Sequence, residues 1–306
     1  MRLIAVLILL LAAGTAALAL RSYPEQPVEL RIGINPWPGY EPLFIARDDG
    51  LFAKHRLAIK LVEFTSVGDC LRGFQQGDVD GMTCTLVEVV LGRQVHLDRP
   101  PVPILVTDSS LGADVLLAQP EIASVSALRG RKIGVEAASL GIFILERALT
   151  KHGMNRTDVT IVALGQDEMA EALRSHRVDA IMTYAPYSIA ASNQGARMLF
   201  SSREIPDEVV DVVAISDKIL QTDPQVAERL RAVWQEVLAQ IARDPAAAHA
   251  RMAQRQKLTL AEFTASLDGI AITPAADQER LLAAGGAVDI SLDQIARILA
   301  GKGGIP

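Results

Sequence analysis

The chain has 306 residues, half of them hydrophobic, and a formal net charge of −6. That length suffices for about two domains, and the apolar content for a sizeable core. The negative charge, and the lack of a basic run interleaved with aromatic residues, argue against nucleic-acid binding. The five scattered histidines and two cysteines fit no metal-ligand spacing, so we expect no metal and no cofactor.

An apolar segment opens the chain. Arg2 precedes the uncharged run Leu3–Leu20, and Ala17-Leu18-Ala19 offers a cleavage site. We expect residues 1–19 to be a signal peptide, with an uncleaved membrane anchor as the alternative because the run just reaches the length of a spanning helix. Both predict a periplasmic protein, which meets the membrane only through a transporter or through this uncleaved segment.

The first predicted strand, 29–34, runs into a loop with two aromatic residues. Pro36 ends the strand because proline cannot donate to a sheet ladder, and a helix follows at 43–49. Three loop residues are candidate ligand contacts: Trp37, Gly39 and Tyr40. The alternative is that the aromatic rings only cap the rim of the core. Two aromatic side chains around a glycine favour stacking on a ligand.

Strands and helices alternate over the first two thirds of the chain, which predicts parallel sheets flanked by helices. We expect further strands at 58–63, 79–83, 103–107, 115–118, 132–135, 160–163, 180–182, 197–200 and 208–215. The helices between them are expected at 67–76, 85–93, 140–152, 166–175 and 184–194. After residue 216 only helices are predicted, at 224–243, 245–256, 260–267 and 292–299. The predicted class is therefore α/β with a helical C-terminal region.

Four phrases in this order resemble the periplasmic solute-binding proteins of the nitrate, sulfonate, taurine and thiamine-pyrimidine ABC importers. They are RIGINPWPGYEPLFIARDDGLF (31–52), EFTSVGDCLRGFQQGDVDG (63–81), LRGRKIGVEAASLGIFILERAL (128–149) and VDAIMTYAPY (178–187). The resemblance implies a type II periplasmic binding protein with two α/β lobes around a cleft. The first lobe would hold 28–107 and 216–306, and the second 114–213. The crossings would lie near 108–113 and 213–216.

Ligands of open α/β sheets bind beyond the carboxyl ends of strands, so loops after strands supply the other candidates. These ligand-binding candidates are Thr65, Ser66, Asp69, Thr83, Cys84, Thr85, Asp108, Asp114, Glu136, Ser139, Gly141 and Tyr184. For the hydroxyl residues, helix capping is an equal alternative. Asp108 could instead cap its own turn, and Glu136 could be an exposed acid at a strand end. Tyr184 is expected to leave the sheet and to stack opposite Trp37.

The two cysteines, Cys70 and Cys84, flank one helix–strand unit. In an oxidising compartment they could form a disulfide, but spacing does not give the geometry. The alternative, which we favour, is that both are small buried residues.

The candidate loops carry acids and aromatic rings but almost no cation apart from Arg72. We therefore expect an aminopyrimidine-like or other amine-bearing ligand, followed by taurine or an alkanesulfonate. The resemblance implies a monomeric binding component of an ABC importer whose permease and ATPase are separate chains. The alternatives are a membrane-anchored ligand sensor and an enzyme of the thiamine-pyrimidine synthase type. The enzyme is disfavoured because the chain lacks the Cys-rich motif of that synthase.

Overall fold

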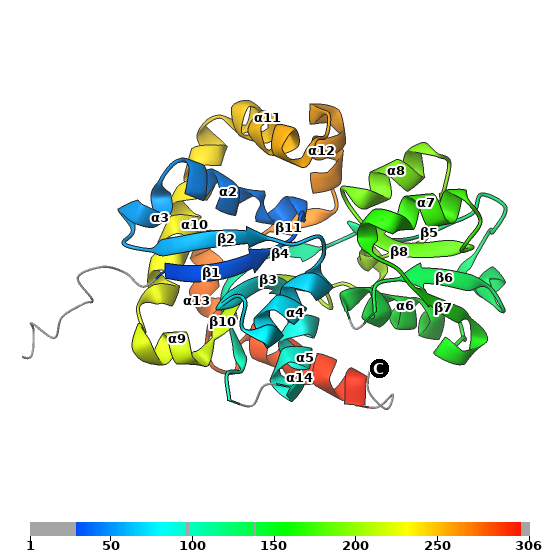
Figure 1. The fold of residues 1–306 in the computed structure, drawn as a ribbon, viewed down its shortest axis with the longest axis horizontal. Coiled ribbons are helices and arrows are strands. Elements are labelled where there is room, and N and C mark those ends of the chain that lie inside the picture. The colour runs from blue at the N-terminus through cyan, green and yellow to red at the C-terminus, as the bar shows by residue number, and fades with distance from the viewer. Residues whose placement is uncertain (1–28, 96–97, 138, 301–306) are drawn as a thin grey trace, which may run out of the picture.

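The computed structural model describes residues 29–95, 98–137 and 139–300. The expected signal peptide or anchor at 1–19 lies outside them. Within these ranges, no helix is both long and apolar enough to span a bilayer. Figure 1 shows two lobes side by side, each built on a sheet with helices against its faces. The fold class predicted from the sequence is therefore confirmed.

The sheet of lobe 1 has six strands in the order β11-β4-β10-β3-β1-β2. They are β1 (Glu29–Ile34), β2 (Ala58–Glu63), β3 (Gly81–Thr85), β4 (Pro101–Ser110), β10 (Val210–Ser216) and β11 (Ile270–Ile272). β1 runs parallel to β2 and β3, whereas β10 is antiparallel to β3 and β4. The carboxyl ends of β1 and β2 point toward lobe 2 (Figure 1). The loops that follow these strands therefore face the other lobe.

Lobe 1 takes its helices from both ends of the chain. The early ones are α2 (Glu41–Asp48), α3 (Leu51–Lys54), α4 (Val67–Gln76) and α5 (Leu86–Val95). The late ones are α9 (Asp217–Thr222), α10 (Val226–Arg243), α11 (Pro245–Gln256), α12 (Leu260–Leu267), α13 (Gln278–Leu282) and α14 (Ala287–Ala300). Trp234 of α10 is fully buried, and its Nε1 donates to the Thr273 carbonyl at 3.0 Å. The helical C-terminal region thus packs on lobe 1.

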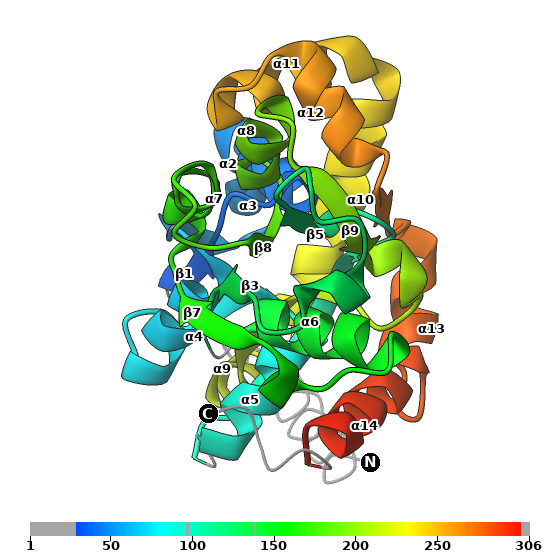
Figure 2. The same ribbon diagram turned by 90° about the vertical axis from the view of Figure 1, so that its right-hand side faces the viewer.

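The sheet of lobe 2 has five strands in the order β7-β6-β8-β5-β9. They are β5 (Asp114–Ala118), β6 (Lys132–Val135), β7 (Thr160–Ala163), β8 (Ala180–Tyr184) and β9 (Arg197–Ser201). Its helices are α6 (Leu140–Lys151), α7 (Met169–Arg174) and α8 (Tyr187–Asn193). Figure 2, which views the molecule from the side of lobe 2, shows α6, α7 and α8 around this sheet.

The second crossing between the lobes does not lie where the sequence placed it. β10 is hydrogen-bonded between β3 and β4, so it belongs to the sheet of lobe 1. The second connection is therefore 202–209, between β9 and β10, and the expected 213–216 was wrong. The first connection shortens to 111–113 because β4 continues to Ser110. An apolar strand reads the same in either sheet, and its pattern does not say which one it joins.

The lobes touch each other directly. The Tyr187 hydroxyl of α8 donates to the Thr65 carbonyl of lobe 1 at 2.7 Å, and the Trp37 and Tyr184 rings meet across the boundary. These contacts show that the lobes are in a closed arrangement.

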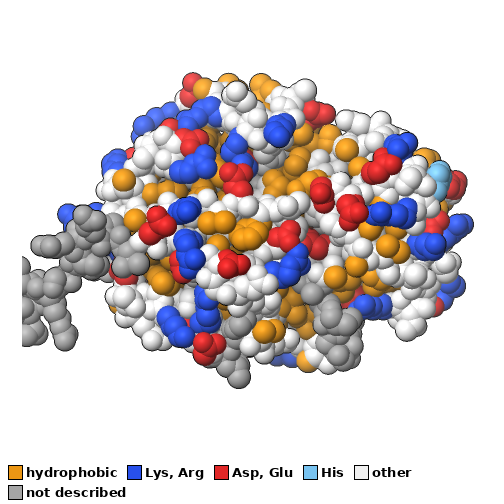
Figure 3. Space-filling model, in the orientation of Figure 1, with side chains coloured by type: hydrophobic (Ala, Val, Ile, Leu, Met, Phe, Trp, Pro, Cys, Tyr) orange, Lys and Arg blue, Asp and Glu red, His pale blue; other side chains and the backbone are white. Residues whose placement is uncertain are grey.

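On the face in Figure 3, acidic and basic side chains are interspersed over both lobes.

Candidate ligand site between the lobes

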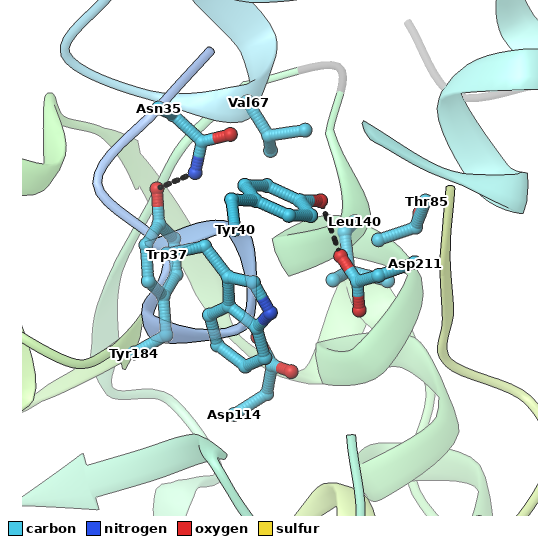
Figure 4. A pocket seen from close by; sticks show the side chains of 9 residues that line it. All are labelled: Asn35, Trp37, Tyr40, Val67, Thr85, Asp114, Leu140, Tyr184 and Asp211. Atoms are coloured by element: carbon cyan, nitrogen blue, oxygen red, sulfur yellow. Dashed lines mark hydrogen bonds between the residues drawn. The ribbon is translucent and has the colours of Figure 1, made fainter. Parts of the chain in front are cut away.

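Two adjoining pockets lie between the lobes and share Val67, Asp114, Leu140 and Tyr184. The first is also lined by Asn35, Trp37, Tyr40, Thr85 and Asp211 (Figure 4). The second is also lined by Glu136, Ser139, Gly141, Gln166, Met182 and Thr183. Each has room for about one water molecule in this closed arrangement. An organic ligand must therefore enter when the lobes are apart or when side chains move.

Aromatic side chains form one wall of the first pocket. The rings of Trp37 and Tyr184 are 5.7 Å apart with an interplanar angle of 72°, an edge-to-face contact. Asn35 Nδ2 donates to the Tyr184 hydroxyl at 3.3 Å. Tyr184 reaches Trp37, but it does not leave the sheet as expected, since it is the last residue of β8 and pairs with Asp114 of β5. The expected stacked arrangement was also wrong.

Two buried acids of lobe 1 lie side by side next to this wall. Asp108 of β4 and Asp211 of β10 are register partners in neighbouring strands. Trp37 Nε1 donates to Asp108 Oδ1 at 3.1 Å, and the Tyr40 hydroxyl donates to Asp211 Oδ1 at 2.5 Å. Burial raises the pKa of Asp108 to about 7, and burial together with the neighbouring Asp108 raises the pKa of Asp211 well above its usual value.

Two more buried acids come from lobe 2. Asp114 begins β5, and burial raises the pKa of its carboxyl to about 7. Glu136 follows β6, and burial raises its pKa to about 7 as well. Its Oε1 accepts hydrogen bonds from the Ser66 hydroxyl and from the Gly68 amide at 3.1 Å, both in lobe 1. Glu136 is 5 % exposed, so the alternative of an exposed strand-end acid is wrong.

One carboxylate oxygen of each acid has no partner. These buried atoms are Asp108 Oδ2, Asp114 Oδ2, Glu136 Oε2 and Asp211 Oδ2. The pocket walls contain no Lys, Arg or His among the described residues. Burying an ionised carboxylate without a partner costs several kcal/mol. The site is therefore rich in acceptors and short of donors, and a ligand with N–H groups would supply what it lacks.

Most of the other predicted site residues lie behind the pockets or away from them. Gly39 lies against Asp108, where a Cβ atom would come 2.2 Å from Oδ2. Ser66 and Ser139 are the N-caps of α4 and α6, as the capping alternative predicted, and Ser66 also contacts Glu136. Seven predicted contacts do not line either pocket: Gly39, Thr65, Ser66, Asp69, Thr83, Cys84 and Asp108.

Four of these seven residues, Thr65, Asp69, Thr83 and Cys84, have roles away from the other acids of the site. Thr65 offers only its carbonyl, to Tyr187, and Asp69 pairs with Arg72 at the surface. Thr83 is buried within β3. Cys84 and Cys70 are buried free thiols, the alternative favoured from the sequence.

Several lining or adjoining residues were not predicted: Asn35, Val67, Glu88, Leu140, Gln166 and Asp211. For two of them the sequence did carry a signal. Glu88 stands in the apolar run LVEVVL and Asp211 in VVDVVAI. An acid within a run that is otherwise apolar is buried with it, and buried acids are rare unless they have a partner or a function. This signal could have identified both.

The family model of the NMT1-like family matches residues 23–257. The chain belongs to this family. The NMT1-like chain is 29% identical over 238 residues to a Bacillus subtilis protein named as an aliphatic sulfonates-binding protein, covering 70% of each chain. It is 28% identical over 198 residues to an Escherichia coli protein of the same name, covering 61% of this chain and 57% of that protein.

Solved structures show the same fold. The periplasmic aliphatic sulphonate binding protein SsuA of Escherichia coli superposes with a TM-score of 0.74 at 21% identity, covering 92% of this chain and 94% of that one. The Xanthomonas axonopodis pv. citri alkanesulfonate-binding protein SsuA bound to MOPS gives 0.75 at 20%, covering 92% and 95%. The nitrate-binding protein NrtA of Synechocystis gives 0.64 at 14%, covering 79% and 70%.

These findings confirm the periplasmic binding protein fold and the resemblance stated from the sequence. The chain is a solute-binding protein of the NMT1-like family, and relatives of it are named for aliphatic sulfonates. Its relatives are binding proteins, which confirms the expectation of a binding protein rather than an enzyme.

Proposed function

We propose that the protein captures a small amine-bearing organic molecule in the interlobe site and delivers it to an ABC importer. The observation that carries this proposal is the set of four buried carboxylates, each with one unpartnered oxygen and none paired with Lys, Arg or His of the described residues. A protonated amine brings positive charge and several N–H donors to such a site. An aminopyrimidine-like heterocycle with an exocyclic amine fits the same chemistry.

Capture proceeds by closure of the lobes on the ligand. Asp108 and Asp211 belong to lobe 1, whereas Asp114 and Glu136 belong to lobe 2. A cation between them attracts acids on both sides, and it lowers the mutual repulsion that opposes closure. The rings of Trp37 and Tyr184 add a π face next to the positive group, which favours cations further. The closed molecule then docks on the importer.

An alkanesulfonate or taurine is the second candidate, because relatives of the chain are named for aliphatic sulfonates. A sulfonate would place its negative charge among carboxylates in a poorly hydrated site, where like charges repel strongly. Taurine has an amine as well as a sulfonate, so only one of its ends meets this repulsion. The site residues therefore support an amine over a simple sulfonate.

The remaining roles follow from the same proposal. The protein would act in the periplasm as a monomer, with the permease and the ATPase as separate chains and without a cofactor. An anchored ligand sensor would use the same lobe closure. The amino-terminal segment on which that choice depends lies outside the described residues.

A ligand screen tests this function. Thermal unfolding is measured with primary amines, diamines, aminopyrimidines, taurine, ethanesulfonate and nitrate, and any hit is followed by calorimetric titration. A ligand at about 100 times its Kd stabilises the folded protein by about 2.7 kcal/mol, which moves the melting temperature by several degrees. Stabilisation by amines and not by ethanesulfonate is expected. Stabilisation by ethanesulfonate and nitrate alone would overturn the proposal.

A further inference from the structure

The Glu136 carboxylate of lobe 2 is hydrogen-bonded to the amino-terminal end of a helix in lobe 1. Its Oε1 accepts from the Gly68 amide at 3.1 Å and from the hydroxyl of Ser66, the N-cap of α4. The approach is so close that a Cβ atom on Gly68 would lie 2.4 Å from this oxygen. The position therefore requires glycine as long as the carboxylate occupies it.

A second glutamate makes the reciprocal contact. Glu88 belongs to α5 of lobe 1 and is fully buried. Its Oε1 accepts from the amide of Leu140, the first residue of α6 in lobe 2, at 2.7 Å. Its Oε2 accepts from the Thr85 hydroxyl at 2.6 Å and from the Thr85 amide at 3.0 Å. Each lobe thus inserts one carboxylate into a helix start of the other.

Free amides and the helix dipole make the start of a helix a favourable place for an anion. In α4 and α6 the glutamates of this chain already take that place. Glu136 is nine-tenths buried or more, and its second oxygen, Oε2, is unpartnered where the residue lines the ligand pocket. The carboxylate therefore binds the helix amides with one oxygen and leaves the other for a donor on the ligand.

We propose that Glu136 and Glu88 determine ligand specificity. Each carboxylate occupies the amino-terminal end of a helix in the opposite lobe. The amides at these two helix ends are therefore not free to bind a sulfonate or nitrate when the lobes are closed. The inference rests on the interlobe site of the proposed function. It goes further because it names which groups reject anions. It also gives the two glutamates a part in closure, since both contacts exist only when the lobes meet.

The test compares Glu136→Ala with Glu136→Gln by calorimetric titration with ethanesulfonate and with nitrate. Alanine vacates the Ser66 and Gly68 donors, whereas glutamine keeps an oxygen on them without the charge. We expect Glu136→Ala to bind ethanesulfonate at least tenfold more tightly than the wild-type protein, and Glu136→Gln to show no gain. Glu171→Ala, which removes an exposed acid of α7, is the matched control and should not change anion binding.

Two results would overturn the inference. In one, neither folded Glu136 variant gains sulfonate affinity. In the other, glutamine gains as much as alanine, so that charge alone and not occupation of the helix start rejects anions. Circular dichroism and thermal unfolding verify that the variants fold. Amine binding by the wild-type protein is scored separately, so a protein that binds no amine but gains sulfonate affinity in Glu136→Ala refutes only the proposed function.

The role of Glu88 is tested through closure, because a buried Glu88 substitution affects packing as well as binding. Glu88→Gln replaces one of the two acceptor oxygens with an NH2 group, so the side chain can no longer accept from both Leu140 and Thr85. Small-angle scattering of the ligand-free protein should show a larger radius of gyration for Glu88→Gln and Glu136→Ala than for Glu171→Ala. An unchanged radius in both glutamate variants would contradict the closure part of the inference.

Discussion

At the scale of single residues, we expect Asp211 to lower the stability of the ligand-free protein and to raise its affinity for an amine. Its side chain is 3 % exposed, one oxygen accepts from Tyr40 and the other has no partner. Asp211→Asn keeps the shape and removes the ionisable carboxyl group. We expect the ligand-free variant to melt at the same or a higher temperature, and amine affinity to fall about 10- to 100-fold, the equivalent of one charged hydrogen bond. Thermal unfolding and titration measure the two effects, and a destabilised variant with unchanged affinity would assign Asp211 a structural role.

The buried acids also predict a pH dependence of stability. The pKa values of Asp108, Asp114 and Glu136 are about 7 in the folded protein, against ordinary values of 3.8 and 4.5. At pH values between the ordinary and the raised pKa, these carboxyl groups are protonated in the folded protein and ionised in the unfolded protein. The free energy of unfolding of the ligand-free protein should therefore be highest near pH 4 to 5 and fall as the pH rises through about 7, by about 1.4 kcal/mol per pH unit for each proton.

The groups that face these acids do not reverse this sign. Glu88 and Asp211 also have raised pKa values, and burial raises those of Tyr40, Tyr184 and both thiols above their usual alkaline values. Acids with lowered pKa values, such as Glu168 and Glu236, titrate below this range. Urea unfolding from pH 5 to 8 checks the prediction, and a free energy that rises over this interval contradicts it.

Amine binding should show the opposite pH trend. A protonated amine is attracted to ionised carboxylates, so the bound state lowers the pKa of the acids and releases protons. Affinity should increase from pH 5 to about pH 7 and level off above it, while the amine stays charged. Titration in two buffers of different ionisation enthalpy at pH 6 would detect the released protons. An affinity that falls as the pH rises from 5 to 7 would argue for an anionic ligand.

At the scale of elements, a buried acid of α2, Glu41, accepts hydrogen bonds from two residues of α11. Glu41 is 1 % exposed, and it accepts from Arg255 Nε at 2.7 Å and from Gln256 Nε2 at 2.8 Å. The Arg255 guanidinium also lies over the Phe44 ring at 3.4 Å. Arg255→Ala leaves Glu41 buried without its cation, and we expect a loss of about 3 kcal/mol in the free energy of unfolding. Denaturant unfolding measures this loss.

The matched control for this ion pair is exposed. Arg174→Ala on α7 removes a surface pair with Glu171, both more than half exposed, and should lower the free energy of unfolding far less than Arg255→Ala does. Equal losses in the two variants would show that the Glu41 contact has no special weight. Because Arg255 and Glu41 lie 214 positions apart, periodicity along the chain could not pair them.

Most elements were predictable because their patterns are local. The strands at 29–34, 58–63, 132–135 and 160–163 and the helices at 67–76 and 245–256 have the expected bounds. Local capping groups explain part of this accuracy, such as Ser66 before α4 and Asp244 before α11. β11, α9 and α13 were not predicted. β11 has three residues, and the two helices are shorter than two turns, too short for the helical period of apolar residues to appear.

At the scale of the whole molecule, closure can be followed with one native fluorophore. The chain has two tryptophans, Trp37 in the cleft and Trp234 in the core of lobe 1. Trp234→Phe leaves Trp37 as the reporter, and we expect it to keep the full fluorescence change on amine binding. Trp37→Phe should lose most of the change and should weaken binding, because Asp108 loses its indole donor. A change that persists in Trp37→Phe and disappears in Trp234→Phe would place the ligand elsewhere.

The sequence by itself determined the α/β class, the helical C-terminal region and the strand-end loops that hold Trp37 and Glu136. Those features depend on short-range periodicity, turn residues and helix starts. Only the tertiary structure decided that β10 joins the first sheet, because an apolar strand does not specify its partner. It also decided that five acids, from β4, β5, β10, α5 and the turn after β6, meet between the lobes, since convergence of residues far apart in sequence depends on how both sheets are assembled.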